Sequence, residues 1–192
     1  MALPGGRHPG AGTANRIVPL GPDYLELIAV VDDGEAALNP LSRRVSEALR
    51  RGAGIATWAV RAGDLDAVKA RLDASGVVST GPRPGSRRRP DGVLLEWRTL
   101  HVGDGLEPVI PFFIEWTLPA GEHPGAVVVD HPAGAVRLKN LRLSSPDPAA
   151  LEQRLGSLLG GLPPLTFERG GREEVSAVVM DVNGHERMLT RA

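Results

Sequence analysis

Two kinds of hydrophobic pattern alternate along the chain. Apolar residues at every second position predict strands at 15–20 and 24–31, joined by the turn Gly21-Pro22-Asp23. Residues 1–14 are rich in Gly and Pro and are expected to form a loop. At 41–51 the apolar residues recur every third or fourth position, with arginines opposite them, which predicts a helix.

The middle of the chain carries the clearest unit. Residues 55–61 are apolar and extended, and Asp64 is a good N-cap for a helix that ends at Gly76. Short apolar runs around a polar, Arg- and Pro-rich loop at 81–92 then predict three strands, at 77–80, 93–99 and 111–118. The order is strand, helix, strand, strand, strand, which is a βαβββ module.

The C-terminal part begins in the same way. Residues 135–143 alternate as in a strand, and Asp147 followed by Pro148 is typical of a helix start. Further strands are expected at 165–168 and 175–182, with no fourth strand after them. Repetition on this scale indicates one supersecondary unit used more than once.

We therefore expect an α+β fold of paired βαβββ modules, one of them incomplete at the N-terminus. The expected parts are N-terminal strands at 1–34, a linking helix at 35–53, a complete module at 54–118 and a βαββ unit at 134–192, together one compact domain. The strand at 24–31 would otherwise leave an unpaired apolar edge. We expect either the C-terminal unit or a second copy of the chain, in a homodimer, to cover that edge.

Composition narrows the class of function. The 192 residues carry a net charge of −1, which gives no electrostatic case for nucleic acid or an anionic membrane as a partner. No stretch is long and apolar enough to span a bilayer, and a cytoplasmic location is expected. The chain has no cysteine, no Gly-rich phosphate loop and no Gly-x-Ser-x-Gly elbow, which argues against thiol chemistry, nucleotide hydrolysis and acyl transfer.

One short motif occurs twice. The runs Tyr24-Leu25-Glu26-Leu27-Ile28 and Phe112-Phe113-Ile114-Glu115-Trp116 each place a glutamate among large apolar residues. A lone carboxylate on an inward sheet face is costly unless something pairs with it. Two of them in similar settings suggest that Glu26 and Glu115 point into a shared cavity; the alternative is that both face solvent.

These segments resemble the vicinal oxygen chelate superfamily of glyoxalases and bleomycin-resistance proteins, and within it the glyoxalase-like domain proteins. The resemblance covers most of residues 8–160 and is carried by His8-Pro9-Gly10-Ala11-Gly12-Thr13-Ala14-Asn15-Arg16, Tyr24-Leu25-Glu26-Leu27, Asn39-Pro40-Leu41, Trp58-Ala59-Val60-Arg61, Arg88-Arg89-Pro90-Asp91-Gly92, Pro111-Phe112-Phe113-Ile114-Glu115-Trp116 and His123-Pro124. It implies that two modules curl into a cupped mixed sheet with the helices outside, and that the cup takes a small polar or anionic molecule.

In metal-dependent members of the superfamily, four ligands come from the first and last strands of the two modules. The resemblance matches Glu26 and Glu115 to the last-strand ligands. The first-strand ligand precedes the helix-starting Asp by seven residues, which gives Thr57 and, if the C-terminal unit supplies the other module, Asn140. Such a set would make a weak site for a divalent metal ion. His8 is a candidate for a further ligand or a general base.

Five polar side chains are candidates for binding the substrate: His8, Asn15, Thr57, Arg61 and Arg89. A guanidinium fork such as that of Arg89 matches an anionic group, although runs of arginine most often face solvent. Most histidines of this chain lie beside Pro or Gly, and a surface loop is the alternative for them.

Trp97 is expected either to form a wall of the cup or to lie in the core. Trp58 and Trp116 are expected on the sheet face opposite to Thr57 and Glu115, packed under helices. As an enzyme, the protein would be a lyase, isomerase or dioxygenase in which Glu26 or Glu115 acts as a base or a ligand. The competing expectation is a non-catalytic protein that sequesters a small molecule; a purely structural domain would need a cup filled by side chains.

Overall fold

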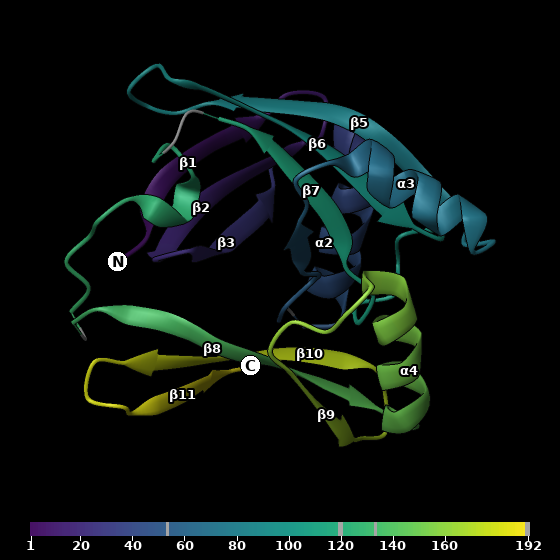
Figure 1. Ribbon diagram of the computed structural model, residues 1–192. Helices are drawn as coiled ribbons and strands as arrows, with labels where there is room; N and C mark the ends of the chain where they lie inside the picture. Colours follow the sequence, from purple (N-terminus) through teal and green to yellow (C-terminus); the bar gives the residue numbers. More distant parts are fainter. Residues whose placement is uncertain (53, 119–120, 133, 191–192) are drawn as a thin grey trace.

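The computed structural model describes residues 1–52, 54–118, 121–132 and 134–190, and these form three β-sheets with helices packed against them (Figure 1). The predicted α+β class is confirmed. The helices of the described part are α1 (Asp33–Leu38), α2 (Pro40–Arg50), α3 (Leu65–Ala74), α4 (Pro148–Leu159) and the short 3-10 helix η1 (Pro124–Ala126). None of the helices in the described part is long and apolar enough to cross a membrane.

The N-terminal sheet contains a strand that the sequence pattern missed. It is antiparallel, in the order β1 (Leu3–His8), β2 (Thr13–Leu20) and β3 (Asp23–Val30). The expected loop at 1–14 was therefore wrong for β1. Glycines weaken a strand signal, but Gly5 is needed here, because a Cβ on it would lie 1.8 Å from Oδ1 of Asn15.

The central unit has the predicted βαβββ order. It comprises β4 (Ala59–Arg61), α3, β5 (Ser79–Arg88), β6 (Leu94–Val102) and β7 (Phe112–Thr117), with the sheet order β4-β7-β6-β5. The expected polar loop at 81–92 was wrong, because most of it belongs to β5. Pro82 and Pro84 are tolerated there because β5 is an edge strand. Such a strand has a neighbour on one side only, so a proline, which has no N–H to donate, can be accommodated in it.

Helix α3 starts where its sequence predicts. Oδ1 of Asp64 accepts hydrogen bonds from the backbone N–H groups of Asp66 and Ala67, at 2.9 and 3.0 Å. Replacing Asp64 by alanine removes both bonds and is expected to lower the free energy of unfolding by about 1 kcal/mol. Urea denaturation measures this; the substitution Asp64→Asn, which keeps an acceptor oxygen, should cost less than half as much, and an equal loss in both variants would contradict the capping role.

The C-terminal sheet differs from the central one. It contains β8 (Val136–Ser145), β9 (Leu165–Arg169), β10 (Glu174–Asp181) and β11 (Glu186–Leu189), in the order β11-β10-β8-β9. The expectation of no fourth strand was wrong, because β11 pairs with β10. The first strand, β8, lies inside this sheet, whereas β4 lies at the edge of the central sheet.

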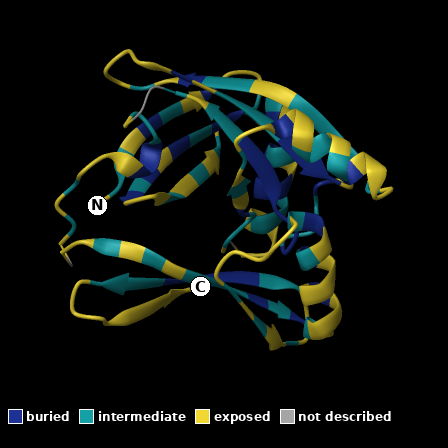
Figure 2. Ribbon diagram, viewed as in Figure 1, coloured by how far each residue is buried: buried dark blue, intermediate teal, exposed yellow. Residues whose placement is uncertain are grey.

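The C-terminal unit does not complete the N-terminal sheet. Strand β8 passes close to β2 and β3, but the three sheets are separate. The C-terminal strands bury their apolar side under α4, in a core shared with the central unit (Figure 2). This core contains Trp58, Leu65, Leu72, Leu100, Val102, Val109, Ile110, Phe113, Leu143, Leu151, Leu155, Leu158 and Val175.

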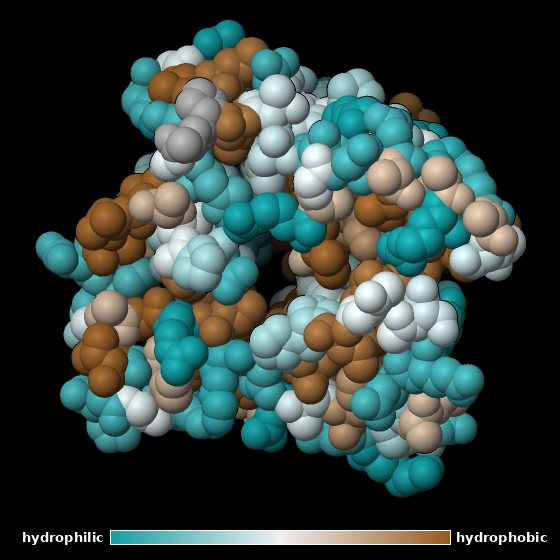
Figure 3. All heavy atoms as spheres, viewed as in Figure 1, coloured by the Kyte–Doolittle hydropathy of each residue, from teal (hydrophilic) through white to brown (hydrophobic). Residues whose placement is uncertain are grey.

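The outer edge of β3 pairs with no strand among the described residues. Leu27 of β3 and Val31, the residue just after it, are 54% and 53% exposed. Coverage of the edge by a second copy of the chain stays a prediction. The space-filling view shows a hollow in the middle of one face, where hydrophobic and hydrophilic residues meet (Figure 3).

Candidate functional site

The strand register gathers polar side chains on one face of the N-terminal sheet. Asn15 lies two positions after Thr13 on β2, and His8 of β1 is the direct partner of Thr13. Glu26 of β3 lies opposite Ile17, two positions further along β2. Because alternate residues of a strand share a face and direct partners do so too, all of these side chains point to the same side.

A hydrogen-bonded group results. Nδ2 of Asn15 donates to Oε1 of Glu26 at 2.6 Å and to Nε2 of His8 at 3.2 Å. Nδ1 of His8 lies 2.8 Å from Oγ1 of Thr13. These partners assign the neutral tautomer with the proton on Nδ1, so that Nε2 carries a lone pair. Nε2 of His8 lies 3.6 Å from Oε1 of Glu26.

Burial sets the charge of this group. Burial lowers the pKa of His8; the nearby Glu26 carboxylate opposes this and Arg87 reinforces it. His8 is therefore neutral near pH 7. The side chain of Glu26 is 31% exposed, whereas His8 and Asn15 are buried. The carboxylate is thus the part of the group that a molecule from solvent reaches first.

Aromatic rings of the central sheet lie against the polar group. The Trp97 ring lies 6.1 Å from His8, edge to face, and 5.2 Å from Trp116, centre to centre. Tyr24 contacts Trp116, with ring centres 6.5 Å apart, and His123 at 5.5 Å. Burial, and after it Glu26, raises the pKa of Tyr24, so its hydroxyl keeps its proton.

Trp58 and Trp116 were expected on the same side, under helices, and the structure separates them. Trp58 is buried in the core with Leu65 and Leu72 of α3, as expected. Trp116 was assigned wrongly, because the β6–β7 register makes it the direct partner of Trp97 and so places it beside the polar group.

The three arginines near this region differ in their partners. Arg87 is 3% exposed; its Nη1 donates to the carbonyl of Gly5 at 2.9 Å, and Glu26 acts on it electrostatically. Arg61 donates to the carbonyl of Pro22 at 2.6 Å and lies 3.1 Å from Nε2 of His123. Arg89 is held by Glu122 at 2.8 Å and by Asp91.

Glu115 does not face Glu26. Its Oε2 accepts from Nη2 of Arg98 at 2.6 Å and from the backbone N–H of Leu65 at 3.1 Å, at the start of α3. Since Trp116 is the next residue, Glu115 lies on the opposite, helix-covered face of the sheet. The expected cup lined by Glu26 and Glu115 was wrong in this respect.

The expected metal-ligand set does not come together. Asn140 donates to Oγ1 of Thr166 at 2.6 Å in the C-terminal sheet, and Thr57 accepts from Arg44. His8 and Glu26 are the two members that lie side by side. The described residues contain no cluster of three or more His, Asp or Glu side chains that could hold a metal ion. The donors present therefore do not fit the four-ligand site of the superfamily.

The sequence pattern did not single out three residues around Glu26, His8 and Asn15: Thr13, Tyr24 and Arg87. Tyr24 and Thr13 carried a signal, because each stands two positions from a predicted site residue and so shares its strand face. Arg87 carried none, since its strand was interpreted as a loop.

Comparison with known proteins agrees with this fold. The model of the family described as "Glyoxalase-like domain" matches residues 2–159. A solved structure of a hypothetical protein from Staphylococcus aureus is similar, with a TM-score of 0.76 and 16% identity, over 97% of this chain and 88% of that chain, which shows the fold alone. No curated protein matches. Over most of its length the chain belongs to the glyoxalase-like domain family of the vicinal oxygen chelate superfamily.

Proposed function

We propose that the protein is an isomerase- or lyase-type enzyme that removes a proton from a carbon next to a carbonyl group, with Glu26 as the general base. The observation that carries this proposal is the pairing of Glu26 with neutral His8. Asn15 is hydrogen-bonded to both, and Nε2 of His8 lies 3.6 Å from Oε1 of Glu26. A carboxylate with a proton-accepting imidazole beside it is suited to take up a proton and return it.

Each member of the group has a part in such a step. Oε1 of Glu26 is held by Asn15, while Oε2 has no hydrogen-bond donor among the described residues and is free to take the proton. The electron pair of the broken C–H bond moves onto the carbonyl oxygen and gives an enolate. Arg87, whose charge acts on Glu26, offsets the negative charge that develops. Glu26 then returns the proton to the same or the adjacent carbon.

The surroundings favour a small molecule with a flat apolar part. Trp97, Trp116 and Tyr24 present ring surfaces beside the polar group, and such surfaces pack against planar groups. A small polar or anionic metabolite with a carbonyl group would suit both the polar group around Glu26 and these aromatic rings.

A second candidate function is sequestration without chemistry. The aromatic contacts around Trp116 support it, because ring surfaces can hold a flat molecule without any group that reacts with it. The two functions differ in what Glu26 does: a binder needs its charge at most, whereas the enzyme needs it to accept a proton.

Proton exchange in heavy water separates the two. A panel of small α-hydroxy and α-keto carbonyl compounds is incubated with the protein in D₂O, and the loss of the α-proton signal is followed by NMR. The wild type should exchange at least one compound. Glu26→Gln should lower that rate at least ~10-fold; His8, being close enough to act as a substitute base, keeps the loss below the ~10²- to 10⁴-fold typical of general bases.

Glu115→Gln is the matched control, because it removes an equivalent carboxylate from the helix-covered face and should leave the exchange rate within about twofold. A compound that raises the melting temperature of the wild type and of Glu26→Gln equally, without exchange in either, would support sequestration and refute the enzymatic proposal.

A further inference from the structure

Arg87 of β5 is a buried guanidinium with an unused edge. It is 3% exposed, and its one side-chain hydrogen bond within the described residues runs from Nη1 to the carbonyl of Gly5, at 2.9 Å. It forms no ion pair in the described part of the chain. A buried charge without a counter-ion is costly, so the free edge formed by Nε and Nη2 calls for an anionic acceptor.

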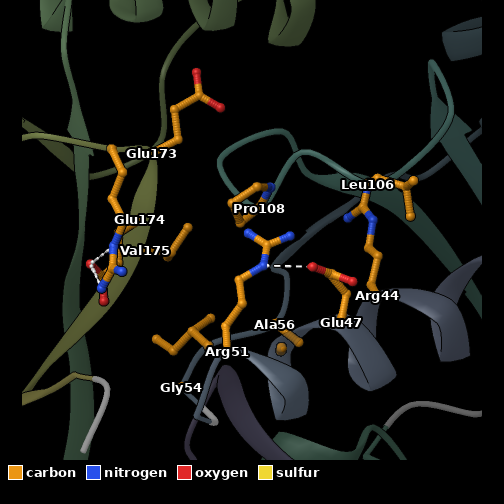
Figure 4. Close-up of a pocket in the computed structure, with 13 residues that line it drawn as sticks. Arg44, Glu47, Arg51, Gly54, Ala56, Leu106, Pro108, Glu173, Glu174 and Val175 are labelled. Atoms are coloured by element: carbon orange, nitrogen blue, oxygen red, sulfur yellow. Dashed lines mark hydrogen bonds and ion pairs between the residues drawn. The ribbon is translucent and has the colours of Figure 1, made fainter.

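Solvent reaches this edge of Arg87. Its Nε and Nη2 have no partner, yet they are not among the polar atoms that are closed to solvent. Arg44, the other buried arginine of the described residues, differs: its Nε and Nη2 are closed to solvent, although it lines a cavity of about 60 Å³ (Figure 4). In that view the Glu47 carboxylate is bound by Arg51 and not by Arg44. Of the two buried arginines, only Arg87 presents free N–H groups to a molecule from outside.

The strand register places Arg87 on the sheet face that carries the candidate site. Arg87 lies two positions after Gly85, the direct partner of Trp97, and Trp97 pairs in turn with Trp116. These residues therefore share one face of the central sheet. Gly85 is needed there, because a Cβ on it would lie 2.4 Å from Nε1 of Trp97. The indole N–H group of Trp97 thus lies over Gly85, on the same face as the guanidinium.

Two further donors on this side of the molecule are unused. Nε1 of Trp97 and the hydroxyl group of Tyr24 have no hydrogen-bond partner within the described residues, and neither atom is closed to solvent. Burial lowers the pKa of Arg87, and Glu26 and Tyr24 oppose that shift, so the guanidinium lies near both of them. Free donors from three strands thus surround one carboxylate base, an arrangement that suits an anion with a carbonyl group.

We propose that the candidate site binds a short oxo acid, whose carboxylate accepts hydrogen bonds from Nε and Nη2 of Arg87 and whose carbonyl group lies within reach of Glu26. The Nε–Nη2 edge of a guanidinium matches a carboxylate in planar, bidentate geometry. One guanidinium near the Glu26 carboxylate favours a ligand with a single negative charge over a dianion such as a phosphate monoester. That the bound acid is also the substrate rests on the proposed function.

Calorimetric titration of the full chain with two matched pairs of compounds tests the charge of the ligand. 2-Oxobutanoate is compared with 2,3-pentanedione, and 4-oxopentanoate with 2,5-hexanedione; in each pair an acetyl group replaces the carboxylate. At equal ionic strength, at least one acid should bind ~10-fold or more tightly than its neutral counterpart, because the charge-assisted bonds to Arg87 are lost with the acetyl group. The proposal is overturned if neither acid binds, or if neither is preferred to its dione.

Arg87→Lys tests whether the planar guanidinium holds the acid. Lysine keeps the positive charge but not the bidentate geometry, so the affinity for the preferred acid should fall ~10-fold or more, while that for the dione stays within about twofold. Arg89→Gln is the matched control, because the Arg89 guanidinium is already held by Asp91 and Glu122, and it should keep the full preference. If a folded Arg87→Lys variant also keeps that preference, the carboxylate binds elsewhere and the proposal fails.

Proton exchange in D₂O separates this proposal from the enzymatic one. A preferred acid that binds but does not exchange would leave the carboxylate site in place and refute the enzyme. A dione that exchanges without any preference for the acids would leave Glu26 as the base and overturn the carboxylate site. A crystal structure of Glu26→Gln with the preferred acid leaves Arg87 unchanged: carboxylate oxygens within about 3 Å of its Nε and Nη2 would support the site, and an acid bound elsewhere would overturn it.

Discussion

Replacing Leu155 by alanine is expected to lower the free energy of unfolding by about 3 kcal/mol. Leu155 of α4 is 0% exposed and lies in the core shared by the C-terminal and central units. Removal of a buried leucine side chain costs ~2–5 kcal/mol, from the lost transfer energy and from the cavity left behind. Urea denaturation followed by tryptophan fluorescence measures the loss, since Trp58 lies in the same core.

Glu152→Ala is the control for this experiment, because Glu152 lies on the exposed side of α4 and should change stability by less than about 0.5 kcal/mol. The shared core also predicts one cooperative transition. If Leu155→Ala unfolds the C-terminal sheet alone, while the fluorescence of Trp58 stays native, the C-terminal and central units do not unfold as one core and the prediction is contradicted.

Acid is expected to destabilise the protein through His101. Burial, and after it the charges of Arg44 and Arg83, lowers the pKa of His101 from 6.5 to about 4. The unfolded chain therefore binds the proton more readily than the folded one. The stabilisation is fully present above pH 6.5 and is lost as the pH falls toward 4, with about 2–3 kcal/mol gone by pH 4.5.

His101→Phe isolates this contribution. His101 stacks on Phe112 with ring centres 5.2 Å apart, and a phenyl ring keeps the stack but does not titrate. The difference in unfolding free energy between pH 7 and 4.5, measured by urea denaturation, should be about 2–3 kcal/mol smaller in the variant. An unchanged difference in His101→Phe would contradict the prediction.

The helices α2, α3 and α4 were predictable because their signals are local. Asp64 and Asp147 each cap a helix start through their own carboxylates, as their positions predicted. β1 and β5 were not predictable in this way. Each is held by pairing with a neighbouring strand, and its glycines and prolines resemble loop residues.

The candidate site was also predictable only in part. His8, Asn15 and Glu26 were singled out from the sequence, and the structure brings them together. Glu115 was paired with Glu26 on the likeness of their neighbours. A strand pattern shows that alternate residues share a face, but it does not show which face is covered by the helix. A shift of one residue in the strand pairing moves every side chain to the other face. Only the contacts of Glu115 with Arg98 and α3 settle its side.

Because Glu115 lies on the other, helix-covered face of its sheet, it cannot act on a molecule held against Glu26. With the Glu26 carboxylate on β3 and tryptophans on β6 and β7 near it, the two sides of the candidate site are chemically unlike. A guest with one flat and one reactive side would enter in a single orientation, and Glu26 would reach only one of its two enantiotopic hydrogens. Deuterium should therefore be incorporated into one mirror-image form of the product.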